Sequence, residues 1–208
     1  MKKAMTITYE EGGALYVNVT NRCPNNCSFC IRNNGDGAYG SDSLWLLYEP
    51  SEEEILASIF ERELSKHREL VFCGYGEPAM RLDVCRAVAL EVKKRVPGMK
   101  TRINTNGQSD LIFGKNTAPM YTDAFDTVSI SLNSASADGY FDMCRPVYGK
   151  KAFDAILTFA KNVKNYVHNT TFTVVREFLA DGELELCYKI AEDTGVPLRV
   201  RTYIGKES

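Results

Sequence analysis

Hydrophobic and polar positions follow two different periods along the chain, and the period changes several times. Alternation with a period of two over residues 5–9 and 15–20, joined by the turn-forming residues 10–13, predicts a β-hairpin. Residues 33–40 are polar and glycine-rich, which predicts a flexible loop. A helix is then expected to begin at Ser51, because an N-cap serine is followed by three glutamates and by apolar residues at helical spacing.

Beyond this helix the pattern becomes a regular alternation of strands and helices. Strands are predicted at residues 70–73, 100–104, 126–132, 171–175 and 198–203, and helices at 82–96, 150–166 and 183–194. Such alternation implies parallel strands joined by right-handed crossovers. Counted from residue 15 there are six such strands, fewer than the eight of a closed barrel of about 250 residues. We therefore expect an α/β fold, a partial (β/α)6 barrel with an open curved parallel sheet, helices outside and an N-terminal hairpin.

Composition limits the kind of protein. The chain has 208 residues, of which 44% are hydrophobic and 25% charged, as in an ordinary globular protein. No repeat or linker divides it, so we expect a single domain over residues 1–208. A net charge of -2 offers no basic field for nucleic acid. No apolar run approaches membrane-spanning length and residues 5–10 lack the apolar stretch of a signal peptide, so we expect a cytoplasmic protein without a membrane association.

Polar, functional-looking segments follow four of the predicted strands. A cysteine loop follows the first strand, and residues 74–78, 105–107 and 131–133 lie at the ends of the next three. Ligands of parallel α/β folds bind at the carboxyl ends of the strands. The sequence therefore predicts a site at this rim.

The cysteine loop carries the most specific motif. Cys23, Cys27 and Cys30 are spaced C-x3-C-x2-C, so one short loop presents three thiolates to a single point. An iron–sulfur cluster normally has four thiolate ligands. With three, one iron is left open to a small molecule, as in catalytic metal sites that keep an open position. The motif favours a catalytic cluster.

Other interpretations of these cysteines stay open. Zinc would need a fourth ligand, which either His67 or His168 could supply if the fold brought it close. Disulfides are disfavoured, since the cysteine count is seven and a chain of this size does not need them. Inert or redox-active thiols are the remaining alternative.

With its neighbours in order, the motif resembles that of radical S-adenosylmethionine (SAM) enzymes, and most closely the small TatD-associated radical SAM proteins. The resemblance covers nearly the whole chain and rests on residues 23–30, 72–78, 103–107 and 129–133. It implies that Cys23, Cys27 and Cys30 ligate three irons of a [4Fe-4S] cluster and that the amino and carboxylate groups of SAM chelate the fourth iron.

The resemblance also implies cofactor contacts. It assigns Phe29 to the adenine through backbone contacts, and Gly76 and Glu77 to the methionyl ammonium. An ammonium group has three donors and needs acceptors, and glycine allows close backbone approach. Tyr75 departs from the family, which usually has a glycine there.

Short polar residues at the next two strand ends are candidates for the ribose hydroxyls and the methionyl carboxylate of SAM. These are Asn104, Ser131 and Asn133, whose side chains donate or accept hydrogen bonds. A plain strand-ending turn and polar alternation on a strand are the competing interpretations.

The remaining cysteines and one arginine have weaker assignments. Cys73, Cys85 and Cys187 are expected in the core. Cys144 is placed in a loop on the same rim as the cluster, where a radical-relay or substrate thiol is conceivable. Arg145 could pair with a carboxylate of the cofactor or substrate, although a solvated loop charge is the commoner role.

As implied by the resemblance, the chain is an iron-dependent oxidoreductase. An external donor such as flavodoxin or ferredoxin reduces the cluster, and SAM is cleaved to methionine and a 5′-deoxyadenosyl radical that abstracts hydrogen from an unidentified substrate. An open cleft favours a protein substrate, as in glycyl-radical-enzyme activation, and a deazapurine-type small-molecule reaction is the alternative. The family name also suggests a link to a TatD-type hydrolase. From a different class, the competing hypothesis is a non-catalytic zinc-binding or cluster-binding recognition module.

Overall fold

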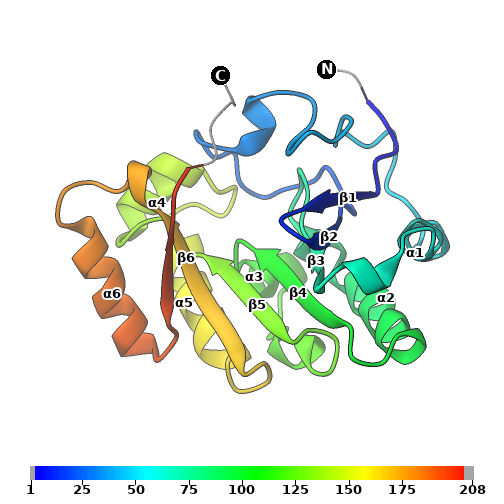
Figure 1. The fold of residues 1–208 in the computed structure, drawn as a ribbon. Coiled ribbons are helices and arrows are strands. Elements are labelled where there is room, and N and C mark those ends of the chain that lie inside the picture. The colour runs from blue at the N-terminus through cyan, green and yellow to red at the C-terminus, as the bar shows by residue number, and fades with distance from the viewer. Residues whose placement is uncertain (1–2, 204–208) are drawn as a thin grey trace.

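Seven strands form one sheet in a computed structural model, which describes residues 3–203. The strands are β1 (Thr8–Glu11), β2 (Ala14–Val17), β3 (Glu69–Phe72), β4 (Lys100–Thr105), β5 (Thr127–Ser131), β6 (Asn169–Val175) and β7 (Leu198–Arg201). Their order in the sheet is their order in the chain. β1 is antiparallel to β2, and every later strand is parallel to its neighbour. The predicted hairpin and the six-stranded open parallel sheet are confirmed (Figure 1).

The hairpin begins three residues later than predicted and turns through two glycines. Gly12 and Gly13 both have positive φ, of 53° and 77°. A two-residue turn with positive φ at both positions matches the right-handed twist of its strands, and glycine adopts it without strain.

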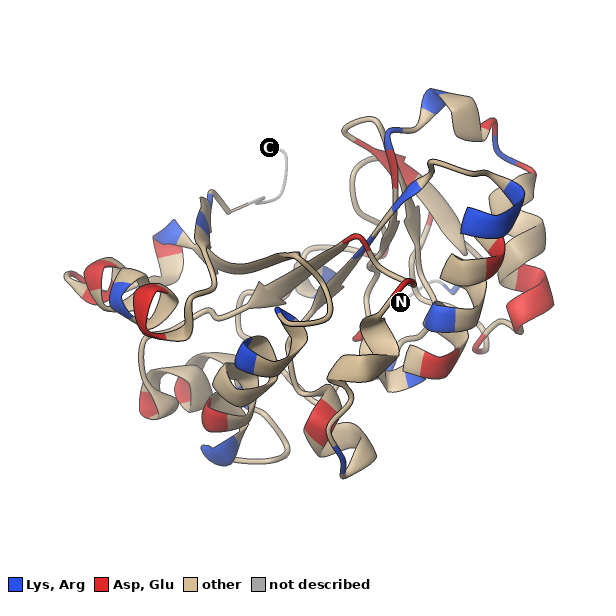
Figure 2. Ribbon diagram, turned by 90° about the horizontal axis from the view of Figure 1, so that it is seen from below, with Lys and Arg blue, Asp and Glu red and all other residues tan. Residues whose placement is uncertain are grey.

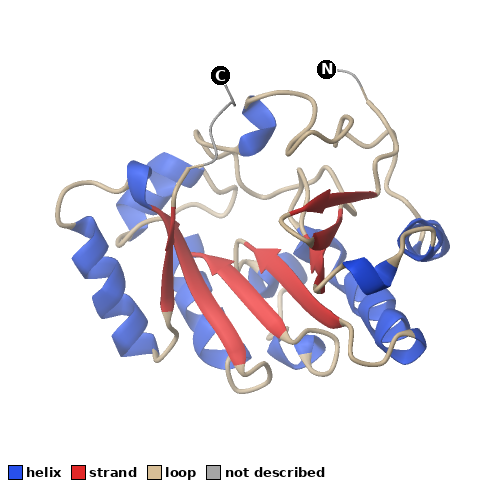
Figure 3. Ribbon diagram, in the orientation of Figure 1, coloured by secondary structure: helices blue, strands red, loops and turns tan. Residues whose placement is uncertain are grey.

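Helices line the outer side of the sheet (Figure 3). They are α1 (Glu52–Phe60), α2 (Leu82–Arg95), α3 (Ser109–Phe113), α4 (Ala137–Cys144), α5 (Lys151–Val163) and α6 (Glu183–Thr194), with 3-10 turns η1 (Ile31–Asn33), η2 (Leu64–Lys66), η3 (Pro78–Arg81), η4 (Ala118–Tyr121) and η5 (Arg176–Phe178). Ser51 caps α1 as predicted, in a reciprocal pair of hydrogen bonds with Glu54.

Two helices were not predicted from the sequence. Within α4 only Tyr140 and Cys144 are buried, so its eight residues give little apolar periodicity. Its start is marked by Ser136, whose side chain accepts a hydrogen bond from the Gly139 N–H. The prediction that Cys144 lies in a loop is wrong, because Cys144 is the last residue of α4.

The two faces of the sheet differ in chemistry. Residues of one parity along the strands face the helices and are buried in a single core; among them are Leu15, Val17, Leu70, Phe72, Ile103, Val128, Ile130, Phe172 and Val174. Residues of the other parity face the concave side and are mostly polar; among them are Arg102, Asn104, Ser129, Ser131, Thr171, Thr173, Arg199 and Arg201. Apolar burial holds the helices on the sheet, and the concave side is left free for polar chemistry.

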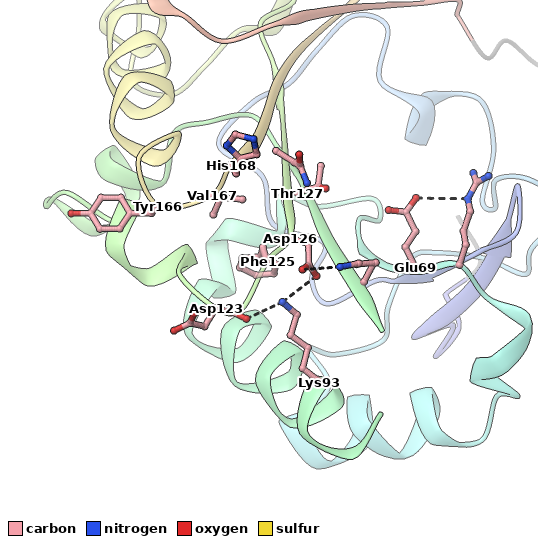
Figure 4. Close-up of a pocket in the computed structure, with 12 residues that line it drawn as sticks. Glu69, Lys93, Asp123, Phe125, Asp126, Thr127, Tyr166, Val167 and His168 are labelled. Atoms are coloured by element: carbon pink, nitrogen blue, oxygen red, sulfur yellow. Dashed lines mark hydrogen bonds and ion pairs between the residues drawn. The ribbon is translucent and has the colours of Figure 1, made fainter. Parts of the chain in front are cut away.

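A polar cavity of about 630 Å³ lies at the amino ends of the strands, opposite the cysteine loop. In its wall, Asp126 accepts a hydrogen bond from Lys93 Nζ at 3.0 Å (Figure 4). It also accepts one from the Thr101 N–H at 2.8 Å. Lys93 also donates to the Asp123 carbonyl at 2.9 Å. These contacts join α2 to the starts of β4 and β5. The polar residues of this cavity therefore stabilise the fold and are not needed for a binding site.

Replacing Asp126 with asparagine is expected to lower the free energy of unfolding by about 1–2 kcal/mol at pH 7, since hydrogen bonds to a charged group are lost. Burial raises the pKa of Asp126, but Thr101 and Lys93 outweigh it and hold the pKa below its ordinary 3.8. The carboxylate therefore stabilises the fold at neutral pH, and this contribution disappears as the pH falls through the lowered pKa. Urea denaturation measures the difference, with the exposed Asp193→Asn as control; equal stability of wild type and Asp126→Asn would contradict it.

Candidate functional site

The cysteine loop follows β2 and lies at the carboxyl ends of the strands. Cys23, Cys27 and Cys30 are partly buried and line one cavity of about 270 Å³. Across residues 3–203, no three His, Cys, Asp or Glu side chains are placed so that they could hold a metal ion. The three thiols thus line the same cavity without forming a site for a single metal ion.

The end of α4 holds the cysteine loop in shape. The Asn26 N–H donates to the Cys144 carbonyl at 2.9 Å, and the Ser28 N–H donates to the Met143 carbonyl at 3.0 Å. These carbonyls belong to the last turn of a helix, where they have no partner within the helix. The loop therefore takes its conformation from an element more than a hundred residues away in sequence.

A buried side-chain network supports the loop from behind. Gln108 Nε2 donates to Asn25 Oδ1 at 2.8 Å and to the Tyr140 hydroxyl at 3.0 Å, while Asn25 Nδ2 donates to the same hydroxyl at 2.9 Å. Gln108 and Tyr140 have no exposed surface, and Asn25 has 4%. Hydrogen bonds are electrostatically stronger in a buried, low-dielectric interior than in water, so these three bonds fix the positions of the side chains. None of these three residues was predicted as a site residue.

Cys144 lies against the cysteine motif and is completely buried. Its thiol is hydrogen-bonded with that of Cys27, and Asn133 Nδ2 approaches Cys144 Sγ at 3.5 Å. The position on the same rim as the motif is confirmed. The thiol faces Cys27 and has no exposed surface, so it supports the motif from behind and is not open to a substrate.

The environment of the three thiols favours their protonated form while no cation is bound. The hydrogen bond with Cys144, together with burial, raises the pKa of Cys27 well above its usual range. Burial, with the nearby Glu77, raises the pKa of Cys23 to about 12, and burial raises that of Cys30. A coordinated metal reverses this preference, because metal ligation deprotonates a thiol.

Glu77 joins the loops that follow β3 and β4. Its carboxylate accepts hydrogen bonds from the Thr105 hydroxyl at 2.6 Å, the Asn106 N–H at 2.7 Å and the Ala79 N–H at 3.0 Å. Burial raises its pKa to about 7, and these donors only partly offset the effect. Glu77 also lines the cavity with the three cysteines. The predicted site residue is therefore in place and also supports two loops.

Gly76 is a point of close backbone approach. A Cβ atom there would lie 2.3 Å from the Thr20 carbonyl oxygen and 2.6 Å from that of Arg22. The next residue, Glu77, donates its N–H to the Arg22 carbonyl at 2.8 Å. The loop that carries Glu77 therefore packs directly on the residues that lead into Cys23, and only glycine fits between them.

Substituting Gly76 with alanine should lower the free energy of unfolding by about 1–3 kcal/mol, the usual cost of overpacking. The loops of Cys23 and Glu77 would move apart, so the iron content after reconstitution should fall as well. Thermal denaturation and iron analysis measure the two effects. Gly35→Ala is the matched control, since the nearest atom to its Cβ is 3.9 Å away. A Gly76→Ala protein with wild-type stability and iron content would show that the loops are not coupled.

Tyr75, the departure from the family pattern, anchors the neighbouring loop. Its ring is 3% exposed, its hydroxyl donates to the Gly35 carbonyl at 3.0 Å, and its edge packs on Trp45 at 5.2 Å between ring centroids. Ala38 and Leu44 are buried with it in a small second core. The predicted flexible loop at residues 33–40 is thus tied to the loop after β3.

The polar candidates at the ends of β4 and β5 all line the cavity with the cysteines: Asn104, Ser131 and Asn133. Asn106, which sequence reasoning left as a turn residue, lines it too. Asn104 Oδ1 and Asn106 Nδ2 are buried, and neither has a hydrogen-bond partner in the described part of the chain. Buried polar atoms are nearly always paired, so these two atoms of the cavity wall could bind a polar ligand.

Phe29 forms part of an aromatic wall of the cavity. Its ring stacks on Phe178 with centroids 4.8 Å apart, and Phe178 meets Tyr203 edge to face at 4.9 Å. Phe178 and Tyr203 were not predicted. They follow β6 and β7, so their position just after a strand was the signal that could have identified them.

Other cavity residues were missed because they alternate with core residues on strands. Tyr16, Thr173 and Arg201 lie on the concave face and line the cavity. Cys73, predicted in the core, lines it as well, and that prediction is wrong because residue 73 has the concave-face parity. Arg145 is exposed at the end of α4 and does not line the cavity.

Comparisons with known proteins agree with this arrangement. Residues 17–188 match the family model of the radical SAM superfamily. Two solved structures share the fold. A radical SAM methyltransferase from Sphaerobacter thermophilus has a TM-score of 0.60 and 14% identity, over 95% of this chain and 69% of that one. SuiB from Streptococcus suis, in a structure bound to S-adenosylmethionine, has a TM-score of 0.62 and 14% identity, over 93% of this chain and 39% of that one.

SuiB has also been solved bound to its precursor peptide SuiA, with a TM-score of 0.60 and 15% identity to this chain. The match covers 90% of this chain but only 38% of the SuiB chain in that structure, so this chain spans less than half the length of SuiB. No curated protein sequence matches the chain. Within the described residues, no helix has the length and apolar character needed to span a membrane.

Proposed function

The chain belongs to the radical SAM superfamily, an enzyme family whose members use a [4Fe-4S] cluster and SAM, and from this membership we propose that its cavity holds both cofactors. Cys23, Cys27 and Cys30 ligate the cluster, and SAM lies beside it. One domain over residues 1–208 carries this site. The observation that carries the proposal is that three thiols of one loop share a cavity with buried, unpartnered amide atoms on the neighbouring strands.

The residues present fit these groups. With the three thiolates of the cysteine loop as its ligands, the cluster would keep one iron for the amino acid end of SAM. The unpartnered atoms Asn104 Oδ1 and Asn106 Nδ2 supply an acceptor and a donor in the same wall. The wall also contains the Phe29 ring and the Ser131 hydroxyl. Thiolates, amides and an aromatic surface together suit a cluster and a nucleoside.

Each predicted cofactor contact then has a physical role. Glu77 receives the methionyl ammonium, because it is the carboxylate in the wall next to Cys23. Asn104, Ser131 and Asn133 hold the ribose hydroxyls and the methionyl carboxylate. Phe29 places its backbone beside the adenine while its ring is fixed by Phe178. Gly76 acts mainly by letting the Glu77 loop approach the cysteine loop.

When bound and reduced, the cluster supplies the electron that breaks the C5′–S bond of SAM and yields a radical able to abstract hydrogen. The protein positions and shields this chemistry. Burial of Asn25, Gln108 and Tyr140 keeps the cysteine loop rigid from behind. The rings of Phe29 and Tyr203 line one side of the cavity, and both pack against Phe178. The Cys144 thiol is hydrogen-bonded with that of Cys27 and would hold the Cys27 sulfur in position as a ligand.

Radical SAM enzymes need a reductant, and we propose flavodoxin or ferredoxin for this one. We further propose a cytoplasmic location, membership of the TatD-associated group and a functional link to a TatD-type hydrolase, all on the motifs given above. A protein or peptide is the favoured substrate, since the cavity opens at the rim of an open sheet. An activase of a glycyl-radical enzyme is one form of this proposal, and a deazapurine-type small-molecule reaction is the alternative.

Anaerobic reconstitution with iron and sulfide tests the proposal. We expect broad absorbance near about 400 nm from the cluster and formation of 5′-deoxyadenosine when SAM and dithionite are added. A protein that instead retains one zinc ion and never forms 5′-deoxyadenosine would support the recognition-module hypothesis.

A further inference from the structure

Three arginines gather on the concave face of the sheet. Arg102 lies on β4, and Arg199 and Arg201 lie two residues apart on the edge strand β7. Figure 2 shows basic positions on this last strand. On β5 and β6 this face carries mainly short polar side chains, among them Ser129, Ser131, Thr171 and Thr173.

The strand register places the two β7 arginines relative to the cofactor site. Ser131 pairs with Thr173, and Thr173 pairs with Arg199, so the three form one row across β5, β6 and β7. Arg201 pairs with Val175 and lines the same cavity as the three cysteines. Arg199 is exposed and lies outside the lining of this cavity. Since successive residues of one face are about 6.6 Å apart along a strand, its long side chain can reach a ligand bound at Arg201.

The carboxylates nearest to these arginines in the described part of the chain have other partners. Glu69 pairs with Arg102 at 3.0 Å. Glu77, the carboxylate that lines the cavity, accepts hydrogen bonds from Thr105 and Asn106. Within residues 3–203, neither Arg199 nor Arg201 has an ion pair with a carboxylate.

Arg199 also lies within the field of the other two arginines. Burial, then Arg201 and Arg102, lower its pKa, and the opposing effects of Tyr16 and Glu69 are smaller. Bringing like charges together costs free energy unless an anion offsets it. Arginines that served only the fold would be expected to pair with nearby carboxylates, so the arrangement indicates a ligand of opposite charge.

We propose that Arg199 and Arg201 bind an anionic group of the substrate, a phosphate or a carboxylate, at the β7 wall of the cavity. The inference rests on the proposed function, because it assumes that the thiol and amide walls around Glu77 hold the cofactors. The anion is bound across the cavity from that wall, where Thr173 of β6 adds a neutral hydrogen-bonding group. Guanidinium groups bind such oxyanions by paired, charge-assisted hydrogen bonds.

Calorimetric titration of the reconstituted, SAM-loaded protein tests this inference. The probes are inorganic pyrophosphate and tricarballylate at constant ionic strength, and the two arms distinguish a phosphate site from a carboxylate site. We expect at least one probe to bind, with affinity reduced about tenfold or more in Arg199→Gln and in Arg201→Gln, since each removes charge-assisted hydrogen bonds. Arg201→Lys, which keeps the charge, should recover part of the affinity. Arg86→Gln, on the outer surface of α2, is the matched control and should bind like wild type.

Two results would overturn the inference. One is the absence of a specific site: neither probe binds at about 10 mM, or a probe binds with the same affinity to wild type, Arg199→Gln and Arg201→Gln. The other is loss of SAM affinity in the arginine variants with competition between SAM and the probe, which would assign these arginines to the cofactor. Failure of the proposed function is distinct, because it is read from 5′-deoxyadenosine formation by the wild-type protein without any probe.

Discussion

Cys27→Ala is expected to lose the cluster and all formation of 5′-deoxyadenosine while keeping its fold. Two thiols from one loop cannot hold the cluster, and without it SAM cannot be cleaved. Cys27 is partly buried and packs only at the edge of the core, so loss of its thiol leaves the fully buried core residues in place. Iron and sulfide analysis, product chromatography and circular dichroism measure the three properties.

Cys187→Ala is the matched control for this substitution. Cys187 is a buried thiol of α6, so its replacement removes a cysteine without touching the cavity, and full iron content is expected. A Cys27→Ala protein that keeps its iron would exclude Cys27 as a ligand. Global unfolding of Cys27→Ala would instead indicate a structural metal.

Glu77→Gln is expected to weaken SAM binding about tenfold to a hundredfold, because a charge-assisted hydrogen bond to the methionyl ammonium is lost. In the wild-type protein, the Thr105 hydroxyl and the Asn106 N–H both donate to the Glu77 carboxylate. In the variant, the NH2 group of the glutamine would face one of these donors, so that hydrogen bond is lost. Calorimetry with SAM on the reconstituted protein measures the effect. Glu192→Gln, an exposed glutamate of α6, is the control. Unchanged SAM affinity in Glu77→Gln would assign the ammonium to another acceptor.

The raised pKa of Glu77 adds a pH dependence. With a pKa of about 7, part of the population is protonated at neutral pH and offers no charge to the ammonium. SAM affinity of the wild type should therefore rise as the pH increases through about 7, and Glu77→Gln should not show this rise. The stability of the fold depends on pH in the opposite direction, because the folded protein favours the protonated carboxyl. The contribution of Glu77 to the free energy of unfolding is complete below its ordinary pKa of 4.5 and is lost as the pH rises through about 7.

The sequence was sufficient for the regular elements and for the motif residues. Periodicity predicted β2 to β7 and the long helices, because apolar residues of one parity or one helical face must be buried. The spacing of Cys23, Cys27 and Cys30 predicted a shared site, and the strand-end rule predicted that Glu77 and Asn104 would join it. Each of these inferences depends on local pattern or on one topological rule.

The remainder depends on contacts between distant segments. Cys144 was assigned to a loop because its helix has few apolar positions, and its contact with Cys27 needs the tertiary fold. Cys73 and Tyr16 were missed because parity alone does not tell which face of a sheet is the core. Asn25 and Gln108 are separated by 83 positions, and no local pattern predicts their hydrogen bond.

The central claim is that the cluster keeps one iron free for SAM. Electron paramagnetic resonance of the reduced, reconstituted protein, recorded before and after addition of SAM, tests it most directly. The account predicts that the cluster signal changes when SAM binds. A signal that SAM leaves unchanged, in protein with full iron content, would mean that every iron is already ligated by the polypeptide, and the proposed chemistry would be excluded.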